Sequence, residues 1–273
     1  MLSGAMVSLK RRIYGLPILR NYRLRRAASA LGSPRLMPEG FQFASYPMMF
    51  EPTWEAAERQ IISGLLPQSA AFIDVGANHG FYALLAARVG KPVVAIEPDE
   101  GNLAILRSNI ALNQADVEVH AAALSDTNGE SWVYGDGDMA SLLQAWQGVG
   151  KHFRQKVATV RLDEAINSRW RGEQLLIKID VEGAEDRVLA GASATLARVP
   201  KPIWLIETYP RLPTGGPCPA FRKVFETMRA AGYEARLATD LEKIVSEDDV
   251  DAWVRDPLRS SNFLFREPVA GPA

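Results

Sequence analysis

The stretch that decides the fold is Phe72-Ile73-Asp74-Val75-Gly76-Ala77-Asn78-His79-Gly80-Phe81-Tyr82. An apolar run over residues 70–73 stops at an acid, two glycines follow, and a helix-like stretch covers residues 81–89. The pattern predicts a strand, a tight turn and a helix. Gly76 and Gly80 suit a sharp turn that a ligand approaches closely, because neither carries a Cβ. The start of the helix directs free N–H groups and the positive dipole end into the same space, which favours the polar end of a nucleotide-like ligand.

The spacing around this turn narrows the choice of ligand. A dinucleotide fingerprint would read G-x-G-x-x-G, but Asn78 stands at the second glycine position, which argues against a nicotinamide oxidoreductase. Asp74, just before the turn, suits an ammonium group better than a pyrophosphate. A second apolar run ends at Glu97, about 20 residues after Gly76, where a parallel strand presents an acid to ribose hydroxyls. An adenosine that carries an amino acid fits both acids, so the sequence predicts S-adenosyl-L-methionine as the cofactor.

Further along the chain, strand-like and helix-like segments alternate. Two more apolar runs, residues 175–179 and 203–206, end at Asp180 and Glu207. Alternating segments predict an α/β fold with a doubly wound, Rossmann-like parallel sheet and a site at the carboxyl ends of its strands. Helices are expected over residues 51–66, 101–113, 181–190 and 220–231, a third strand over 117–120, an inserted hairpin at 131–134 and 157–162, and a last strand at 262–265.

Composition bounds the class of protein. The chain has 273 residues, 47% of them hydrophobic and 23% charged, with a formal net charge of −1, as expected of a globular protein with ample core. A near-neutral chain has no overall electrostatic footprint for nucleic acid, so no nucleic-acid partner is expected. The single cysteine, Cys218, suits a reducing compartment. No apolar run is long enough for a membrane span and no secretion signal is recognisable, so a cytoplasmic location is predicted.

The N-terminal residues 1–50 differ from the rest and are interpreted as a basic extension that precedes a catalytic domain at 51–273. Residues 10–26 contain seven basic side chains and no acid. One interpretation is an arm that touches an anionic membrane surface or a polyanionic substrate. The other is a solvated segment that packs loosely or is disordered. The irregular apolar pattern and Pro17, which would break a helix, favour the second.

Two motifs carry a resemblance to a known family. The turn at residues 74–80 and Ile177-Lys178-Ile179-Asp180-Val181-Glu182-Gly183-Ala184-Glu185 resemble the FkbM-type family of S-adenosylmethionine-dependent methyltransferases. Glu97-Pro98, Ala123-Leu124-Ser125-Asp126 and Asn262-Phe263-Leu264-Phe265 also match, so the likeness spans residues 51–265. It implies a class I fold with seven strands, the last antiparallel, and O-methylation of a sugar, polyketide or other secondary metabolite. His79, where the family often has an apolar residue, and the basic arm depart from the pattern.

Carried onto matching positions, the resemblance implies roles for individual residues. The methionine part of the cofactor would lie against the turn, the ribose against Glu97, and the adenine near Ser125 and Asp126. The turn residues concerned are Asp74, Gly76, Ala77, Asn78 and Gly80. A general base helps because an alkyl hydroxyl is a weak nucleophile. The candidates, in order, are Asp180, Glu182 and His79.

Simpler explanations compete with these roles. Glu185 and Asp186 suit a helix start by charge alone, and His79 could be a partly exposed residue at another helix start. Asp180 and Glu207 could form half of a magnesium site, but the sequence offers no third ligand, so no metal is expected.

Two other functions remain open. Methylation of nitrogen or of a macromolecule is disfavoured because residues 180–183 lack the Asn/Asp-Pro-Pro-Tyr/Phe tetrapeptide, and a non-catalytic cofactor-binding scaffold would have no use for acids at 180 and 182.

Overall fold

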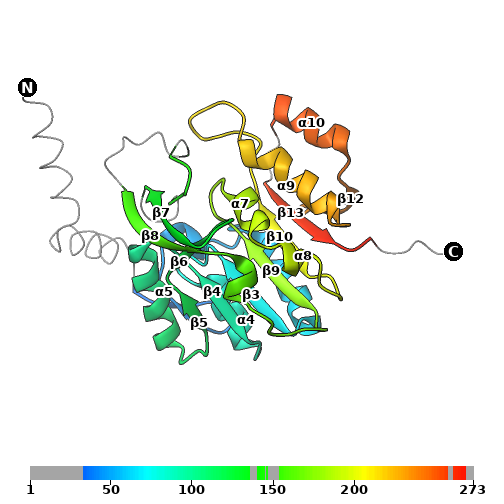
Figure 1. The fold of residues 1–273 in the computed structure, drawn as a ribbon. Coiled ribbons are helices and arrows are strands. Elements are labelled where there is room, and N and C mark those ends of the chain that lie inside the picture. Colours follow the sequence, from blue (N-terminus) through cyan, green and yellow to red (C-terminus); the bar gives the residue numbers. More distant parts are fainter. Residues whose placement is uncertain (1–32, 136–139, 145, 147–153, 258–260, 269–273) are drawn as a thin grey trace, which may run out of the picture.

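The computed structural model describes residues 33–135, 140–144, 146, 154–257 and 261–268 (Figure 1). Its strands are β1 (Arg35–Leu36), β2 (Gln42–Phe43), β3 (Ala71–Val75), β4 (Val93–Ile96), β5 (Glu118–His120), β6 (Ala122–Leu124), β7 (Gly129–Tyr134), β8 (Arg154–Val160), β9 (Leu175–Ile179), β10 (Ile203–Glu207), β11 (Glu234–Leu237), β12 (Asp240–Ile244) and β13 (Asn262–Arg266). Its helices are η1 (Pro47–Phe50), α3 (Ala56–Leu65), η2 (Leu66–Gln68), α4 (Phe81–Arg88), α5 (Glu100–Leu112), α6 (Leu162–Ala165), α7 (Glu185–Ala190), α8 (Ser193–Leu196), α9 (Pro219–Ala230) and α10 (Glu247–Arg255).

The central sheet confirms the doubly wound α/β prediction. In the described part of the chain it has eight strands in the order β12-β11-β13-β10-β9-β3-β4-β5. Strands β5, β4, β3, β9 and β10 are parallel neighbours, and β13 runs antiparallel between β10 and β11. The strand order reverses between β3 and β9, which is where such sheets bind ligands. The seven expected strands are joined by β12, a mostly exposed strand whose polar sequence carries no strand signal.

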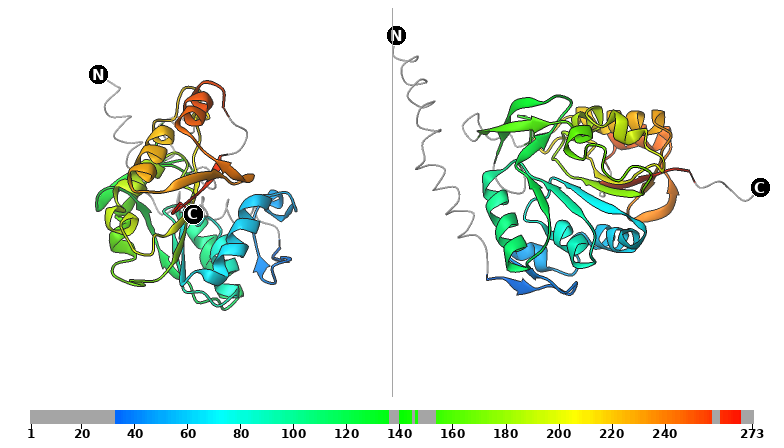
Figure 2. Two further views of the ribbon diagram at one scale, coloured as in Figure 1. Left: turned by 90° about the vertical axis from the view of Figure 1, so that its right-hand side faces the viewer. Right: turned by 60° about the horizontal axis from the view of Figure 1, so that its bottom comes forward.

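Helices cover both faces of this sheet (Figure 2). Successive side chains of a strand leave opposite faces, so neighbouring β3 residues enter different cores. Phe72 packs in the cluster that contains Phe81 of α4, whereas Ile73 packs in the cluster that contains Phe221 of α9. Helices α3, α4 and α5 therefore cover one face, and α7, α9 and α10 the other. None of the helices in the described ranges is both long and apolar enough to cross a membrane.

The boundary expected at residue 50 does not coincide with a boundary in packing. Met37, Phe41, Phe43 and Met49 are buried in the same cluster as Phe81, and Phe41 and Phe43 each contact the Phe81 ring edge-on. The apolar layer that covers α4 therefore includes residues from Met37 onward, because these side chains are removed from water by packing against α4. The basic stretch at residues 10–26 lies outside the described residues.

The inserted hairpin is present and is larger than expected. Strands β7 and β8 pair antiparallel, and β6 pairs parallel with β8, giving a three-stranded sheet that we call the flap sheet. A small apolar cluster joins it to the loop before α7. The members of this cluster are Ala123, Val133, Leu142, Val157 and Ala184. Much of the stretch between the two expected hairpin strands, residues 135–156, lies outside the described residues.

Helix α7 begins later than expected, and the reason lies in the backbone. The sequence predicted a helix from residue 181, but it starts at Glu185. Glu182 has φ 57° and Gly183 has φ 92°, both in the left-handed region. For glutamate this conformation costs roughly 1–2 kcal/mol relative to the ordinary helical region. The strain falls on one of the predicted catalytic residues.

Candidate active site

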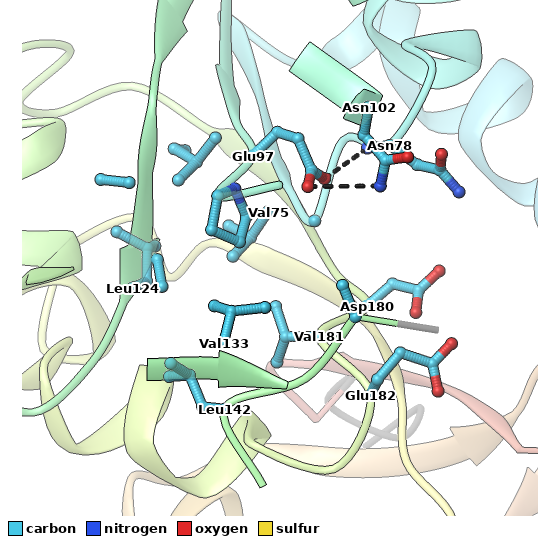
Figure 3. A pocket seen from close by; sticks show the side chains of 16 residues that line it. Val75, Asn78, Glu97, Asn102, Leu124, Val133, Leu142, Asp180, Val181 and Glu182 are labelled. Atoms are coloured by element: carbon cyan, nitrogen blue, oxygen red, sulfur yellow. Dashed lines mark hydrogen bonds between the residues drawn. The ribbon is translucent and has the colours of Figure 1, made fainter. Parts of the chain in front are cut away.

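A cleft of about 560 Å³, part of it open to solvent, lies at the carboxyl ends of β3, β4 and β9 and under the flap sheet (Figure 3). One end is apolar, and the other carries acids and amides. The lining residues are Val75, Gly76, Asn78, Ile96, Glu97, Pro98, Asn102, Ala122, Ala123, Leu124, Val133, Ala140, Leu142, Asp180, Val181 and Glu182.

The turn after β3 is glycine-rich because the protein's own backbone approaches it. A Cβ on Gly76 would lie 1.7 Å from the carbonyl oxygen of Asp180, and φ at Gly76 is 81°. The Asp180 N–H donates to the Val75 carbonyl over 2.9 Å. A Cβ on Gly80 would meet Leu106 at 2.4 Å. The glycines therefore allow the end of β9 and helix α5 to pack against the turn. This packing requires glycine at both positions more directly than the approach of a ligand, which the sequence suggested.

Glu97 occupies the centre of a hydrogen-bonded wall. Its Oε2 accepts from the Asn78 N–H over 2.8 Å, and its Oε1 accepts from the Asn102 side chain over 3.3 Å (Figure 3). Oε1 also accepts from the Asp99 N–H over 2.8 Å. The carboxyl group is 4% exposed. Burial, and less strongly Asp99, raises the pKa of Glu97 to about 8 although these hydrogen bonds oppose the shift. The geometry leaves one face of a fixed carboxylate directed into the cleft.

Asp180 and Glu182 form the acidic end. Their carboxyl groups lie side by side and point the same way, away from the apolar wall of Leu124, Val133 and Leu142 (Figure 3). Asp180 Oδ2 accepts a hydrogen bond of 2.8 Å from Lys178 Nζ, and Lys178 is 3% exposed. Among the described residues, no cation forms an ion pair with Glu182. The two acids therefore sit in different electrostatic surroundings.

The backbone at Glu182 is held by three contacts. Ser141 Oγ donates to the Glu182 carbonyl over 2.6 Å, and Glu185 Oε1 accepts from the Gly183 N–H over 2.7 Å. The Trp146 ring packs on Gly183, where a Cβ would come within 2.6 Å of it. Glu185, only 1% exposed, thus fixes the loop before α7 in addition to favouring a helix start. Asp186 pairs with Lys223, in agreement with the helix-end interpretation.

A second group of acids surrounds Lys178. Tyr82 Oη donates to Glu55 Oε2 over 2.6 Å, and its ring lies 5.0 Å from Lys178 Nζ. Across the sheet, Tyr209 Oη and Ser261 Oγ donate to Glu207 Oε1, the latter over 2.9 Å. Burial alone would lower the pKa of Lys178, but the carboxylates of Asp180, Glu55, Asp74 and Glu207 outweigh it and raise the pKa.

Burial also raises the pKa of other acids near the cleft. Burial followed by the Asp180 and Glu207 carboxylates raises the pKa of Glu182, and burial followed by Asp180 raises the pKa of Glu207. Burial and the Asp180 charge raise the pKa of Asp74 to about 7 even though Lys178 opposes the shift. The site therefore concentrates acidic groups that titrate near neutral pH, a property common in functional sites.

His79 does not reach the cleft, and the structure contradicts its expected exposure at a helix start. The ring is fully buried, its Nδ1 lies 2.6 Å from Ser45 Oγ, and its centroid lies 4.9 Å from that of Tyr46. Burial lowers the pKa of His79 to about 4 although a hydrogen bond with Asn102 raises it. The ring packs behind the turn because residues 44–46 cover it, so these contacts favour a structural role.

The remaining predicted residues divide in two groups. Gly76, Asn78, Glu97, Asp180 and Glu182 line the cleft. Outside the lining are Asp74, Ala77, Gly80, Ser125 and Asp126. Asp74 is 1% exposed beneath the turn, with its Oδ2 unpaired among the described residues. The preceding strand β6 lines the cleft where Ser125 and Asp126 were expected. Ser125 instead donates from its Oγ to Asp126 and from its N–H to the Val160 carbonyl.

A family model confirms the resemblance. The model of the methyltransferase FkbM domain matches residues 74–235, more than half of the chain. The chain belongs to the FkbM methyltransferase family. No curated protein matches it.

Solved structures similar to this FkbM methyltransferase share little sequence with it. A 16S rRNA N2 G1207 methyltransferase of T. thermophilus, in complex with AdoMet and guanosine, has 16% identity and a TM-score of 0.44 over 88% of this chain and 50% of its own. A SAM-dependent methyltransferase from Agrobacterium tumefaciens has 11% identity and a TM-score of 0.44 over 88% and 71%. The tRNA (uracil-54, C5)-methyltransferase of Pyrococcus abyssi, with S-adenosyl-L-homocysteine, has 13% identity and a TM-score of 0.38 over 65% of this chain; the chain spans about a third (34%) of that protein. These similarities carry no information on the acceptor.

The cofactor of this methyltransferase is S-adenosyl-L-methionine, and the cleft fits it. Asn78 Oδ1 is buried without a hydrogen-bond partner in the part of the chain that the structure describes, so the turn retains an acceptor for a ligand ammonium. Glu97 offers a carboxylate of the kind that binds ribose hydroxyls. Ile96, Leu124 and Val133 offer an apolar surface for a purine. Among the described residues, no group of three or more His, Cys, Asp or Glu side chains could hold a metal ion.

Sequence reasoning missed several residues of the site. Asn102, the β6 wall and Val133 with Leu142 line the cleft, and Lys178, Tyr209 and Trp146 support the acids. Lys178 lay in a quoted motif, and its position two residues before Asp180 on the same strand face was a usable signal. The flap residues had none, because the insertion's path over the sheet is a tertiary property.

Proposed function

We propose that this methyltransferase transfers the methyl group of S-adenosyl-L-methionine to a hydroxyl of a small molecule or glycan. One observation carries the proposal. Asp180 and Glu182 present adjacent carboxyl groups at the end of the cleft that lies beyond the turn, where a bound methionine portion would place the methyl group (Figure 3). A hydroxyl acceptor needs such groups because it must lose its proton as the new bond forms.

The cofactor supplies a methyl group on a positively charged sulfur, so the leaving group needs no further activation. The protein's task is alignment and exclusion of water. Under this proposal Asn78 and the turn bind the amino acid portion, Glu97 accepts hydrogen bonds from the ribose hydroxyls, and the apolar end holds the adenine. Asp74 beneath the turn contributes negative charge to the ammonium site.

The two acids take different parts in the proposed reaction. Asp180 is paired with Lys178 at 2.8 Å, and this ion pair fixes its position. Glu182 lacks that partner and has a raised pKa, so it binds a proton more tightly. The positive sulfonium lowers that pKa toward neutrality when the cofactor is bound, which is the range that suits a general base. We assign Glu182 as the base and Asp180 as the residue that orients the hydroxyl.

The charge of the site supports an uncharged acceptor. None of the described residues that line the cleft is basic. The buried Lys178 is directed at Asp180 and faces other acids, so its charge is not available to a ligand phosphate. Nucleic acid binding depends on neutralisation of phosphates by Lys and Arg. A neutral hydroxylated metabolite or glycan fits this surface better than RNA.

The cofactor assignment is tested by calorimetric titration of S-adenosylmethionine and S-adenosylhomocysteine. Wild type should bind both, and Glu97→Ala should weaken binding by about 1–3 kcal/mol through loss of charge-assisted hydrogen bonds. Glu100→Ala, at an exposed position three residues further along the chain, should leave the affinity close to wild type. Equal affinities of wild type and Glu97→Ala would remove Glu97 from the ribose site.

The acceptor assignment is tested with methyl-labelled cofactor and a panel of neutral glycans, hydroxylated metabolites, phosphorylated sugars and total RNA. Label is expected in neutral hydroxyl acceptors. Glu182→Gln should lower their turnover by about 10²–10⁴-fold while cofactor affinity stays unchanged. Label in RNA or in an amine alone would overturn the hydroxyl proposal. Tight cofactor binding with no transfer to any member would favour the non-catalytic alternative.

A further inference from the structure

The two walls of the cofactor cleft belong to different parts of the chain. One wall is the start of α5 with Glu97 and Asn102, and the other is the flap sheet, which contributes Val133 and Leu142. The flap sheet (β6, β7 and β8) lies between β5 and β9 in the chain, and a small apolar cluster joins it to the loop before α7. What holds the flap at a fixed distance from α5 therefore determines the width of the cleft.

Gln155 of β8 bridges the two walls. It is the register partner of Val133 in the β7–β8 pairing, so both side chains leave the same face of the flap sheet. Its Nε2 donates to Asp99 Oδ2 over 2.7 Å, and its Oε1 accepts from the Glu100 N–H at 3.4 Å. Both ends of the amide thus contact the first residues of α5.

Asp99 connects Gln155 to Glu97, the residue proposed to bind the ribose. Its Oδ1 caps α5 by accepting from the Gly101 and Asn102 N–H groups over 2.8 and 3.0 Å, and its own N–H donates to Glu97 over 2.8 Å. Glu97 in turn accepts from the Asn78 N–H. A continuous line of hydrogen bonds runs from the flap through α5 and Glu97 to the turn after β3.

We propose that Gln155 is a positioning residue for the cofactor. It joins the flap to the start of α5, and so holds Val133 and Leu142 on one side and Glu97 on the other at the spacing that S-adenosylmethionine requires. The inference rests on the proposed cofactor site and extends it to a residue outside the cleft. A preformed cleft spares the ligand the entropic cost of ordering the flap. Loss of the bridge therefore reduces affinity without removing any direct contact with the ligand.

A series of substitutions at position 155 distinguishes this role from simple packing. The side chain at 155 faces a carboxylate, so its polarity decides the outcome. Gln155→Ala should weaken S-adenosylmethionine binding about five- to tenfold, as expected for a lost hydrogen bond to a charged group. Gln155→Glu should weaken it further because two carboxylates then meet, and Gln155→Lys should bind nearly as wild type because an ammonium donates to Asp99.

A reversed pair gives a second readout. In Gln155→Glu combined with Asp99→Asn, the new amide at position 99 can cap α5 through its oxygen and donate to the new carboxylate at position 155. The double variant should recover most of the affinity lost in Gln155→Glu. Lys156→Ala is the control, since Lys156 lies next in β8 on the exposed face and pairs with Glu130.

All variants are full-length, and each is titrated with S-adenosylmethionine and S-adenosylhomocysteine after its melting temperature is recorded. Wild-type affinity in both Gln155→Ala and Gln155→Glu, or equal losses in the Ala, Glu and Lys variants, would overturn the positioning role while the cofactor site stands. No binding by wild type would overturn the cofactor site and this inference together. If Gln155→Glu does not fold, the comparison of Gln155→Ala with Gln155→Lys decides the question.

Discussion

Lys178 Nζ lies 2.8 Å from Oδ2 of Asp180, two residues further along the same strand. Lys178 is also the register partner of Asp74 in the β3–β9 pairing, so it stands between the acid beneath the cofactor turn and the acid of the proposed transfer site. Glu55 and Glu207 add their charge from either side. A single buried cation therefore makes an otherwise repulsive group of carboxylates compatible with folding.

Lys178→Met should destabilise the protein by about 3–5 kcal/mol, because removal of one partner leaves buried carboxylates without their counter-ion. Chemical denaturation gives the free energy of unfolding. Lys223→Met is the matched control, since Lys223 pairs with Asp186 over 3.1 Å but its side chain is 65% exposed. An exposed pair contributes about 0–1 kcal/mol. Similar losses in the two variants would contradict the central role of Lys178.

His79→Gln should lower stability by about 1–3 kcal/mol because the buried hydrogen bond to Ser45 is disturbed. Turnover at full cofactor saturation should change little, and the dependence of kcat/KM on pH should keep the shape of wild type. A histidine that served as the base would instead give a limb of the profile that disappears in the variant. A hundredfold loss of kcat in a folded variant would restore His79 to the list of catalytic candidates.

Much of the fold was predictable because the buried parallel strands are short apolar runs that end in acids. The strands ending near Asp74, Glu97, Asp180 and Glu207 were placed within about two residues, and their alternation with helices gave the layer arrangement. Strands β11 and β12 and helix α10 were missed. All three have polar sequences, and their positions are decided by the pairing of β11 with β13 and β12 and by packing of Trp253 against Phe263.

The site was predictable at the strand ends and not beyond them. Asn78, Glu97, Asp180 and Glu182 line the cleft as expected, since the carboxyl ends of neighbouring parallel strands meet at one edge. The burial of His79 behind the turn was not predicted, because the side chains of consecutive residues in a turn can point to opposite sides. Gln155 and Val133 could not be placed, because the path of an insertion over the sheet is not encoded in local periodicity.

Gly76→Ala should abolish cofactor binding and cost more than about 3 kcal/mol of stability, because the new Cβ would lie 1.7 Å from the Asp180 carbonyl oxygen. Gly90→Ala provides the control. Gly90 has a similar φ of 75°, but nothing lies within 4 Å of the added Cβ. It should cost only about 1–2 kcal/mol of backbone strain. Thermal unfolding and cofactor titration of both variants test the difference, and equal effects would show that strain alone explains Gly76.

The stability of the cofactor-free protein should fall as pH rises from about 5 to 8. Burial raises the pKa of Asp74 to about 7 and those of Glu97 and Glu185 to about 8, so in this window the folded state holds protons that the unfolded chain has lost. Stability from a raised carboxyl pKa is present below the unfolded value and is lost as pH passes the folded value. Each retained proton contributes up to about 1.4 kcal/mol per pH unit.

Chemical denaturation at several pH values measures this slope, and two further conditions assign it. Saturating S-adenosylmethionine should flatten it, because the sulfonium and ammonium charges stabilise the ionised acids. Glu97→Gln should also reduce it, since one titrating group is then absent. Asp249→Asn is the control, because the donors Lys243 and Ser246 lower the pKa of Asp249 to about 2, well below the window. Stability that rises between pH 5 and 8 in the cofactor-free protein would show that these carboxyl groups are ionised in the fold.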